Sequence, residues 1–170
     1  MHNEPAKSAI EDVPDKLPLF FRSLVLPAIA ATAGSIAIAT GVKEWYPKLE
    51  KPSFNPPGAV FGPVWTVLYT LMGVADYIVA AEGRERDGKV NARKIYKIQL
   101  GLNALWSILF FGFRRPGMAL MEIGALWISI VMTIASFWKI SRIAAMLLVP
   151  YLAWTTFATA LNAAIWWKNR

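Results

Sequence analysis

Five apolar runs alternate with polar stretches along the chain, and this alternation predicts five membrane-spanning helices. Each run is 19 to 25 residues long, and about 20 apolar residues in a helix cross the hydrocarbon core of a bilayer. Lipid offers no hydrogen-bond partner to a peptide group, so runs of this length should be helical. We therefore predict an all-α membrane protein in which a disordered polar tail (1–18) precedes a five-transmembrane-helix bundle (19–168). The five runs cover about 19–40, 61–81, 95–113, 117–138 and 143–167.

Charged residues are scarce and lie mainly between these runs. The chain of 170 residues is 56% hydrophobic and 17% charged, whereas soluble domains average about 45–50% and about 25%. Asp76 and Glu122 alone lie well inside apolar runs, and a charge in the bilayer core is retained only for a reason. We expect both acids near the interface, with Glu122 paired to Arg114 or Arg115. The alternative is that the two acids form a proton or ion relay.

The composition excludes several kinds of site and partner. The chain has no cysteine and a single histidine, His2, so we expect no metal site, no Ser-His-Asp triad and no catalytic residues. The net charge of +7 does not indicate nucleic acid, because the cations flank apolar runs instead of forming a basic stripe. No basic segment leads into an apolar stretch with a cleavage site, so we expect no cleavable signal peptide. Lys and Arg number 11 on the side of the N-terminus and 7 on the other, which favours an inside N-terminus for this multi-pass protein.

The connection between the first two runs, about 41–60, is rich in proline and aromatic residues. Proline fixes φ and removes a backbone donor, so this loop should be stiff. A long ordered loop is more often functional than a plain connection. We predict a lid over one mouth of the bundle, in which Asn55 caps a helix or binds a ligand carboxylate. The prolines of the loop are Pro47, Pro52, Pro56 and Pro57.

Helical spacing places aromatic and polar side chains on three faces that should point inward. Each set has the spacing i, i+4, i+7 and i+11, which defines one face of a helix, and polar groups facing lipid would lack partners. An aromatic wall with few polar groups is typical of a small-molecule site. The alternative for Gln99 and Asn103 is that these amides only hold helices together. The three sets are Trp65, Tyr69, Met72 and Asp76; Gln99, Asn103, Trp106 and Phe110; and Trp154, Ala158, Leu161 and Ile165.

Small residues form ridges on the first and third predicted helices. Such ridges let two helices approach closely, which is how helices associate in lipid. We therefore expect a homodimer, with membrane lipid around it. The ridges consist of Ala30, Ala33, Gly34, Ala37 and Gly41 on the first helix and of Gly101 and Ala104 on the third.

Three blocks of sequence resemble the TspO/MBR family. They read WYPKLEKPSFNPPGAVFGPVWTVLY from Trp45 to Tyr69, QLGLNALWSILFFG from Gln99 to Gly112, and PYLAWTTFATALN from Pro150 to Asn162. The resemblance covers about residues 27–167 and implies a five-helix, often dimeric, bundle that binds tetrapyrroles such as protoporphyrin IX and, in animal members, cholesterol and synthetic drugs. The pocket residues that it implies are Ser35, Phe54, Trp65, Asn103, Trp106, Trp154, Ala158 and Leu161, beside Tyr69 from the same face of the second helix.

The sequence departs from the family pattern at two places. The loop motif commonly has Trp where this chain has Phe54. Phenylalanine lacks the indole hydrogen bond and its easy one-electron oxidation, which argues against the light-driven porphyrin breakdown proposed for some bacterial members. The animal cholesterol motif has Tyr after Leu-Asn, where this chain has Ala163, so cholesterol binding through that motif is not supported.

The expected function is binding, transport or sensing of tetrapyrroles or similar flat hydrophobic ligands, sterols among them. The tetrapyrrole would be a ligand, because no obligatory cofactor is indicated. One alternative is an enzyme that degrades porphyrin through Trp65 or Trp154; another is a small proton-coupled exporter, which needs a deeply placed acid.

Overall fold

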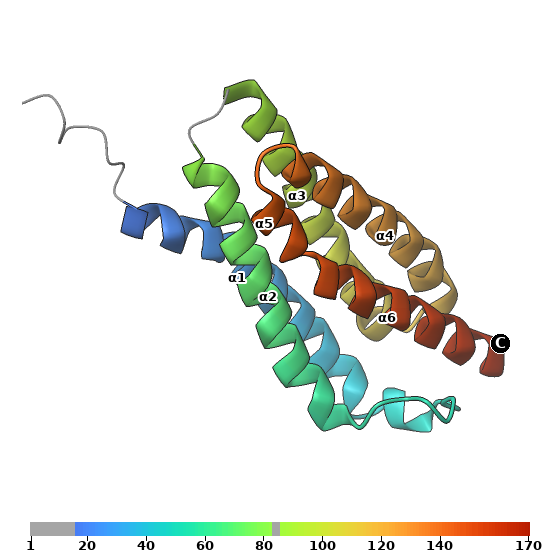
Figure 1. Cartoon of the computed structure of the whole chain (residues 1–170). Helices are drawn as coiled ribbons and strands as arrows, with labels where there is room; N and C mark the ends of the chain where they lie inside the picture. The colour runs from blue at the N-terminus through green and yellow to red at the C-terminus, as the bar shows by residue number, and fades with distance from the viewer. Residues whose placement is uncertain (1–15, 83–85) are drawn as a thin grey trace, which may run out of the picture.

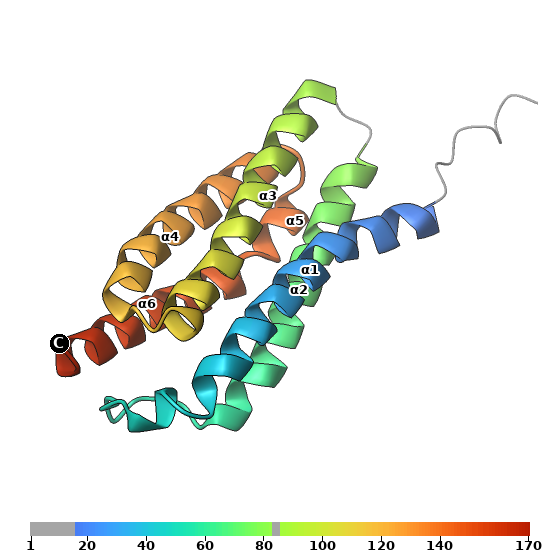
Figure 2. The same cartoon turned by 180° about the vertical axis from the view of Figure 1, so that it is seen from behind.

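The computed structural model describes residues 16–82 and 86–170, which fold into a bundle of helices. Five long helices lie side by side along most of their length (Figures 1 and 2). The predicted tail at 1–15 lies outside the described residues, whereas 16–18 already belong to the first helix. The elements are α1 (Lys16–Val42), η1 (Tyr46–Lys48), α2 (Gly58–Ala81), α3 (Arg86–Ser107), η2 (Ile108–Gly112), α4 (Pro116–Trp138), α5 (Arg142–Met146) and α6 (Val149–Lys168).

Four segments of the described chain are long and apolar enough to cross a membrane. They cover 17–39, 58–81, 116–138 and 142–168. The third predicted span is different, since Arg93, Lys94 and Lys97 lie on α3. In the view from behind, α3 nevertheless lies between α1 and α4 as part of the bundle (Figure 2). The structure thus supports a multi-pass all-α bundle, and the fifth span stays a prediction.

The start of α3 corrects the predicted loop at 82–94. The helix begins at Arg86, nine residues before the expected start at 95. Its polar first half has one apolar face, on which Ala92 and Tyr96 are buried. Packing of that face stabilises the helix although most of its neighbouring residues are charged.

The fifth predicted helix is broken into α5 and α6. Pro150 lies in the first turn of α6, and it has no N–H to donate to the carbonyl four residues earlier, while its ring would clash with that carbonyl. The Leu148 N–H therefore donates to the Ala145 carbonyl at 3.1 Å, three residues back. A single helix over 143–167 was wrong for this reason.

A π-helical turn, η2, follows α3 directly. The Phe113 N–H donates to the Ile108 carbonyl at 2.8 Å, five residues back. Such turns shift the side chains that follow them and are frequent at functional sites. Here the turn buries Phe110 and brings the Phe111 backbone against Gly41 of α1.

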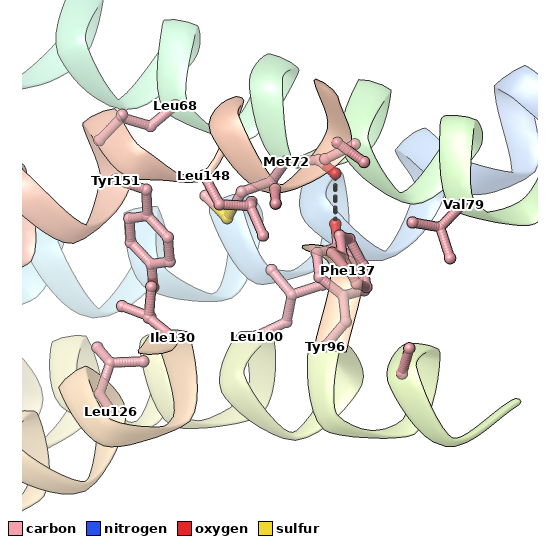
Figure 3. Packing of buried hydrophobic residues seen from close by; sticks show 14 of the residues in the cluster. Leu68, Met72, Val79, Tyr96, Leu100, Leu126, Ile130, Phe137, Leu148 and Tyr151 are labelled. Atoms are coloured by element: carbon pink, nitrogen blue, oxygen red, sulfur yellow. Dashed lines mark hydrogen bonds between the residues drawn. The ribbon is translucent and has the colours of Figure 1, made fainter. Parts of the chain in front are cut away.

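The largest apolar core lies where α2, α3, α4 and α5 meet. Figure 3 shows Met72 of α2, Tyr96 of α3 and Phe137 of α4 pointing toward one another and toward Leu148, which lies between α5 and α6. The Tyr96 hydroxyl donates to the Met72 carbonyl at 3.1 Å. A second, smaller apolar cluster is formed by Phe110, Ala119, Leu161 and Ile165, and Trp45, Tyr46 and Leu49 of the first connection pack against it.

Most of the small-residue ridge of α1 faces the interior of the protomer. Ala30, Gly34, Ala37 and Gly41 are buried. A Cβ on Gly34 would lie 3.3 Å from Ser107 Oγ, and one on Gly41 would lie 2.5 Å from the Phe111 carbonyl oxygen. These residues cannot form the exposed dimer surface that the sequence suggested, because they already let α1 approach α3 and η2.

Candidate functional site

A cavity of about 810 Å³ lies among α1, α2 and α6, with α3 and η2 at its back. Pockets for small molecules usually measure about 300–1,000 Å³. In Figure 1, α2 and α6 face the viewer and diverge from α5 toward the first loop. Residues of α2 and α6 line the cavity on two sides, and α1 forms a wall of short side chains that includes Ala31, Gly34 and Ser35.

Aromatic rings from five elements (η1, α2, α3, η2 and α6) line the cavity. Trp65 and Tyr69 on α2 lie with ring centroids 5.3 Å apart, and Trp106 stacks on Phe110 at 5.3 Å. Trp154 on α6 packs against Phe61 at 5.8 Å and against Phe157 at 5.4 Å. Aromatic pairs in these arrangements gain about 0.5–1.5 kcal/mol beyond the burial of their area. The wall is therefore held in shape by its own contacts.

Seven of the nine predicted ligand-binding residues line this cavity. Six of them lie on the faces that the helical spacing predicted, and Ser35 was implied by the family resemblance alone. The structure shows that these residues line one cavity, and their binding of a ligand stays a prediction. The seven are Ser35, Trp65, Tyr69, Trp106, Trp154, Ala158 and Leu161.

Asn103 lies behind the wall. It is 2% exposed, its Oδ1 accepts a hydrogen bond from the Tyr69 hydroxyl at 2.6 Å, and its Nδ2 donates to the Tyr151 hydroxyl at 3.0 Å. The amide thus joins α2, α3 and α6 and orients Tyr69, which does reach the cavity.

Phe54 also lies outside the lining. Its side chain is 50% exposed and packs edge-on to Phe157 at 6.3 Å. Phe157 lines the cavity, so Phe54 braces the wall from the first loop. A ligand contact at Phe54 would require movement of the loop.

A second polar link fixes Trp106. Its indole N–H donates to Asn162 Oδ1 at 3.1 Å, and Asn162 Nδ2 donates to the Pro116 carbonyl at 2.8 Å. Pro116 begins α4, so this asparagine connects α3, α4 and α6. Because the indole N–H of Trp106 is already hydrogen-bonded, Trp106 presents its apolar ring to the cavity.

The first loop is ordered by its own hydrogen bonds. The Tyr46 hydroxyl donates to Asn55 Oδ1 at 2.7 Å, and Asn55 Nδ2 donates to the Pro56 carbonyl at 3.0 Å. Burial raises the pKa of Tyr46 while its hydrogen bond to Asn55 lowers it, and the net direction is upward. Asn55 therefore holds the loop together; it does not cap a helix. The backbone N–H of Glu50 also donates to Asn169 Oδ1 at 3.0 Å, which ties the loop to the end of α6.

Sequence reasoning missed several lining residues. Phe61 lies four residues before Trp65, so it extends the inward face that the spacing had already defined. Phe157 lies three residues after Trp154 and belongs to the same side of α6. Tyr46 and Lys43 carried no such signal, because their place in the lining depends on how the chain turns after α1.

The predicted ion pair of Glu122 is wrong, and Asp76 has a partner that the sequence had not suggested, while the predicted position of both acids near the interface stays a prediction. Asp76 is 2% exposed and accepts two hydrogen bonds from Arg93 of α3, from Nε to Oδ1 at 2.7 Å and from Nη2 to Oδ2 at 2.8 Å. Glu122 forms no ion pair with Arg114 or Arg115. Both of its carboxylate oxygens are buried with no hydrogen-bond partner among the described residues, while Arg114 lies 3.8 Å from Glu44. Neither acid lines the cavity.

Comparison with known proteins identifies the family of the chain. The sequence profile of the TspO/MBR family matches residues 23–168. The chain is 47% identical over 137 residues to the tryptophan-rich protein TspO of Archaeoglobus fulgidus, which covers 81% of this chain and 88% of that protein. It is 38% identical over 144 residues to the human translocator protein (84% of this chain, 85% of that protein). It is also 38% identical over 144 residues to the tryptophan-rich sensory protein of Cereibacter sphaeroides (85% and 87%). The chain therefore belongs to the TspO/MBR family and is a multi-pass integral membrane protein.

Proposed function

We propose that the protein binds a tetrapyrrole, or a similarly flat apolar molecule such as a sterol, in the cavity among α1, α2 and α6. It does so as a transporter or sensor in the membrane. The observation that carries this proposal is the aromatic wall around a cavity of about 810 Å³. Flat macrocycles stack on aromatic side chains, and stacking of nucleic-acid bases contributes about 1–3 kcal/mol each. The relatives are named as translocator and sensory proteins, which agrees with a binding role.

The two alternatives from the sequence find less support. A porphyrin-degrading enzyme needs groups that move protons or electrons, and the charged side chain among the described lining residues is Lys43. Light-driven chemistry through the indoles of Trp65 or Trp154 remains testable by illumination. A proton-coupled exporter needs an acid at its substrate site, whereas Asp76 is paired with Arg93 away from the cavity.

The test compares two tryptophans in the purified protein. Trp154 lines the cavity, while Trp127 donates to Thr156 Oγ1 at 2.8 Å on the outside of α4 and α6. We expect Trp154→Ala to raise the Kd for protoporphyrin IX by at least a few-fold in the dark. Trp127→Ala is the matched control and should leave the Kd within about twofold. Affinity is measured by quenching of the remaining tryptophan fluorescence.

Three results would decide against the proposal or refine it. Equal affinity of the wild type and a well-folded Trp154→Ala variant would place Trp154 in packing alone. A larger effect of Trp127→Ala would move the site outside the cavity. Absorbance bands of new products after illumination would favour the enzyme, whereas quenching without products favours binding.

A further inference from the structure

Lys43 places a positive charge at one end of an otherwise largely apolar cavity. It follows α1 directly and is the charged side chain among the described residues that line the cavity. The opposite end is formed by apolar residues such as Leu24 and Pro27. These residues lie nineteen and sixteen positions earlier on the same helix, so about 25–30 Å of α1 separates the two ends. The cavity is therefore amphipathic along its long direction.

The ammonium group of Lys43 has no partner among the described residues. The adjacent acid, Glu44, lies 3.8 Å from Arg114 Nη2 and so faces the turn between η2 and α4. Within the described chain, no hydrogen bond or ion pair satisfies Lys43. Its charge is thus available to a molecule in the cavity.

The other cation close to the cavity is already engaged. Lys51 Nζ donates to the carbonyls of Pro47 at 3.3 Å and Leu49 at 3.2 Å, and it lies 4.9 Å from the centroid of the Tyr46 ring. Lys51 therefore stabilises the first loop. The Tyr46 hydroxyl, which belongs to the cavity lining, donates to Asn55, whereas Lys43 has no such contact among the described residues.

The surroundings of Lys43 add to its attraction for anions. The loop end of the bundle carries two glutamates, Glu44 and Glu50, against seven lysines and arginines. A cluster of one sign of charge at the mouth of a cleft attracts ligands of the opposite sign. The seven cations are Lys43, Lys48, Lys51, Arg114, Arg115, Lys168 and Arg170.

We propose that Lys43 recognises a ligand carboxylate at the loop end of the cavity, so that the preferred ligands are amphiphilic anions with an apolar body. This inference rests on the proposed function of the cavity and adds the ligand's charge and orientation to it. The acid group lies beside Lys43, and the apolar rings extend inward between Trp65 and Trp154. Neutral esters of the same compounds lack the ionic contact and bind more weakly.

The test uses a pair of probes that differ in charge alone. Protoporphyrin IX carries two carboxylates, and its dimethyl ester carries none. Dissociation constants are measured in the dark by tryptophan quenching, with the full-length protein in nanodiscs of zwitterionic phosphatidylcholine. The variants are Lys43→Gln, Lys43→Arg and, as a matched control, Lys48→Gln. Lys48 is exposed at the end of η1 and does not line the cavity.

We expect Lys43→Gln to weaken binding of the acid roughly 3- to 10-fold, the range of one hydrogen bond to a charged group in partly exposed surroundings, and to leave the ester unchanged. Lys43→Arg should retain acid binding. Lys48→Gln removes one cation of the same cluster without touching the cavity, so it should weaken acid binding by less than about twofold and leave ester binding unchanged. Equal loss of acid and ester in Lys43→Gln would show a structural role and overturn the inference. Wild-type affinities that are equal for acid and ester, with no effect of Lys43→Gln, would also overturn it while leaving the proposed function intact. If neither probe binds the wild type, the proposed function falls together with the inference.

Discussion

Replacing Asn103 by leucine should lower stability far more than it lowers ligand affinity. The side chain is almost fully buried behind the cavity wall. Leucine has a similar volume but cannot accept from Tyr69 or donate to Tyr151. Interhelical hydrogen bonds in membrane proteins contribute about 0.6 kcal/mol on average and at most about 1.7 kcal/mol. Loss of two such bonds therefore costs about 1–3 kcal/mol.

The loss of the Asn103 hydrogen bonds affects Tyr69 and Tyr151 differently. Tyr69 lines the cavity, where its hydroxyl can turn toward water or a ligand. Tyr151 is buried, and a buried polar group left without a partner costs about 1–3 kcal/mol by itself. We therefore expect a total near 2 kcal/mol, which is about a 30-fold change in the unfolding equilibrium.

The assay is reversible unfolding in mixed detergent micelles, followed by far-ultraviolet circular dichroism. Asn91→Leu is the control, because Asn91 is exposed near the start of the same helix, and it should change stability by less than about 0.5 kcal/mol. The triple variant with Tyr69→Phe and Tyr151→Phe should recover part of the loss, because replacing all partners by apolar groups leaves none unsatisfied. If Asn103→Leu is as stable as the wild type, or if the triple variant is no more stable than the single one, the reasoning about this link is wrong.

Three further predictions follow from the described contacts. Arg93→Gln leaves the carboxylate of Asp76 buried without its partner and should lower the free energy of unfolding by about 3 kcal/mol or somewhat less, since Arg93 is 31% exposed and water can reach the site. Adding Asp76→Asn should restore much of this loss in the same unfolding assay, and no recovery would contradict the pairing. Gly41→Ala places a Cβ against the Phe111 carbonyl and should lower the free energy of unfolding by about 1–3 kcal/mol. The control Gly101→Ala, whose Cβ meets nothing within 4 Å, should be neutral or stabilise by up to about 1 kcal/mol. Equal effects of the two variants in the unfolding assay would refute the close approach of α1 and η2. Replacing Pro56 and Pro57 by glycine should speed porphyrin dissociation roughly 3- to 10-fold, because each change loosens the first loop by about 0.4–1 kcal/mol; stopped-flow rates that match the wild type would make this loop a connection only.

The apolar pattern predicted most of the fold because each long run has to become a helix in lipid. It failed where a local signal opposed the pattern. Pro150 stands inside the fifth run, and a proline in a helical pattern marks a break. The charged residues before Ile95 suggested a loop, yet Ala92, Tyr96 and Leu100 repeat every four residues and are buried. Weighing that repeat above the charge would have extended the predicted helix back to Ala92, closer to its actual start at Arg86.

Helical spacing predicted which faces point inward, but not how deep each residue lies. Asn103 and Trp106 lie on one face of α3, and only Trp106 reaches the cavity. The difference arises because Tyr69 and Tyr151 approach Asn103 from two other helices and cover it. Contacts between helices far apart in sequence decide depth, and no single segment carries that information.

The ion pair of Asp76 shows the same limit. Asp76 lies on α2 and Arg93 on α3, seventeen residues apart, and the predicted loop had placed Arg93 outside the bundle. Once α3 begins at Arg86, the guanidinium reaches back along the helix to Asp76. An error in a helix boundary thus hid an ion pair between two neighbouring helices.

Small residues bring the α1 wall of the cavity close to α3 and η2. Among the described residues, the hydroxyls of Thr32 and Ser35 donate to carbonyls within α1 itself, whereas α2 is joined to α3 by the Asp76–Arg93 pair. Packing of small residues therefore holds α1 in place, and in lipid such packing competes with lipid tails that are equally apolar. We therefore expect α1 to move more readily than α2 when the cavity widens around a flat ligand. Ligand exchange should then depend most on how closely the small residues of α1 pack, although most of them offer a ligand no polar contact.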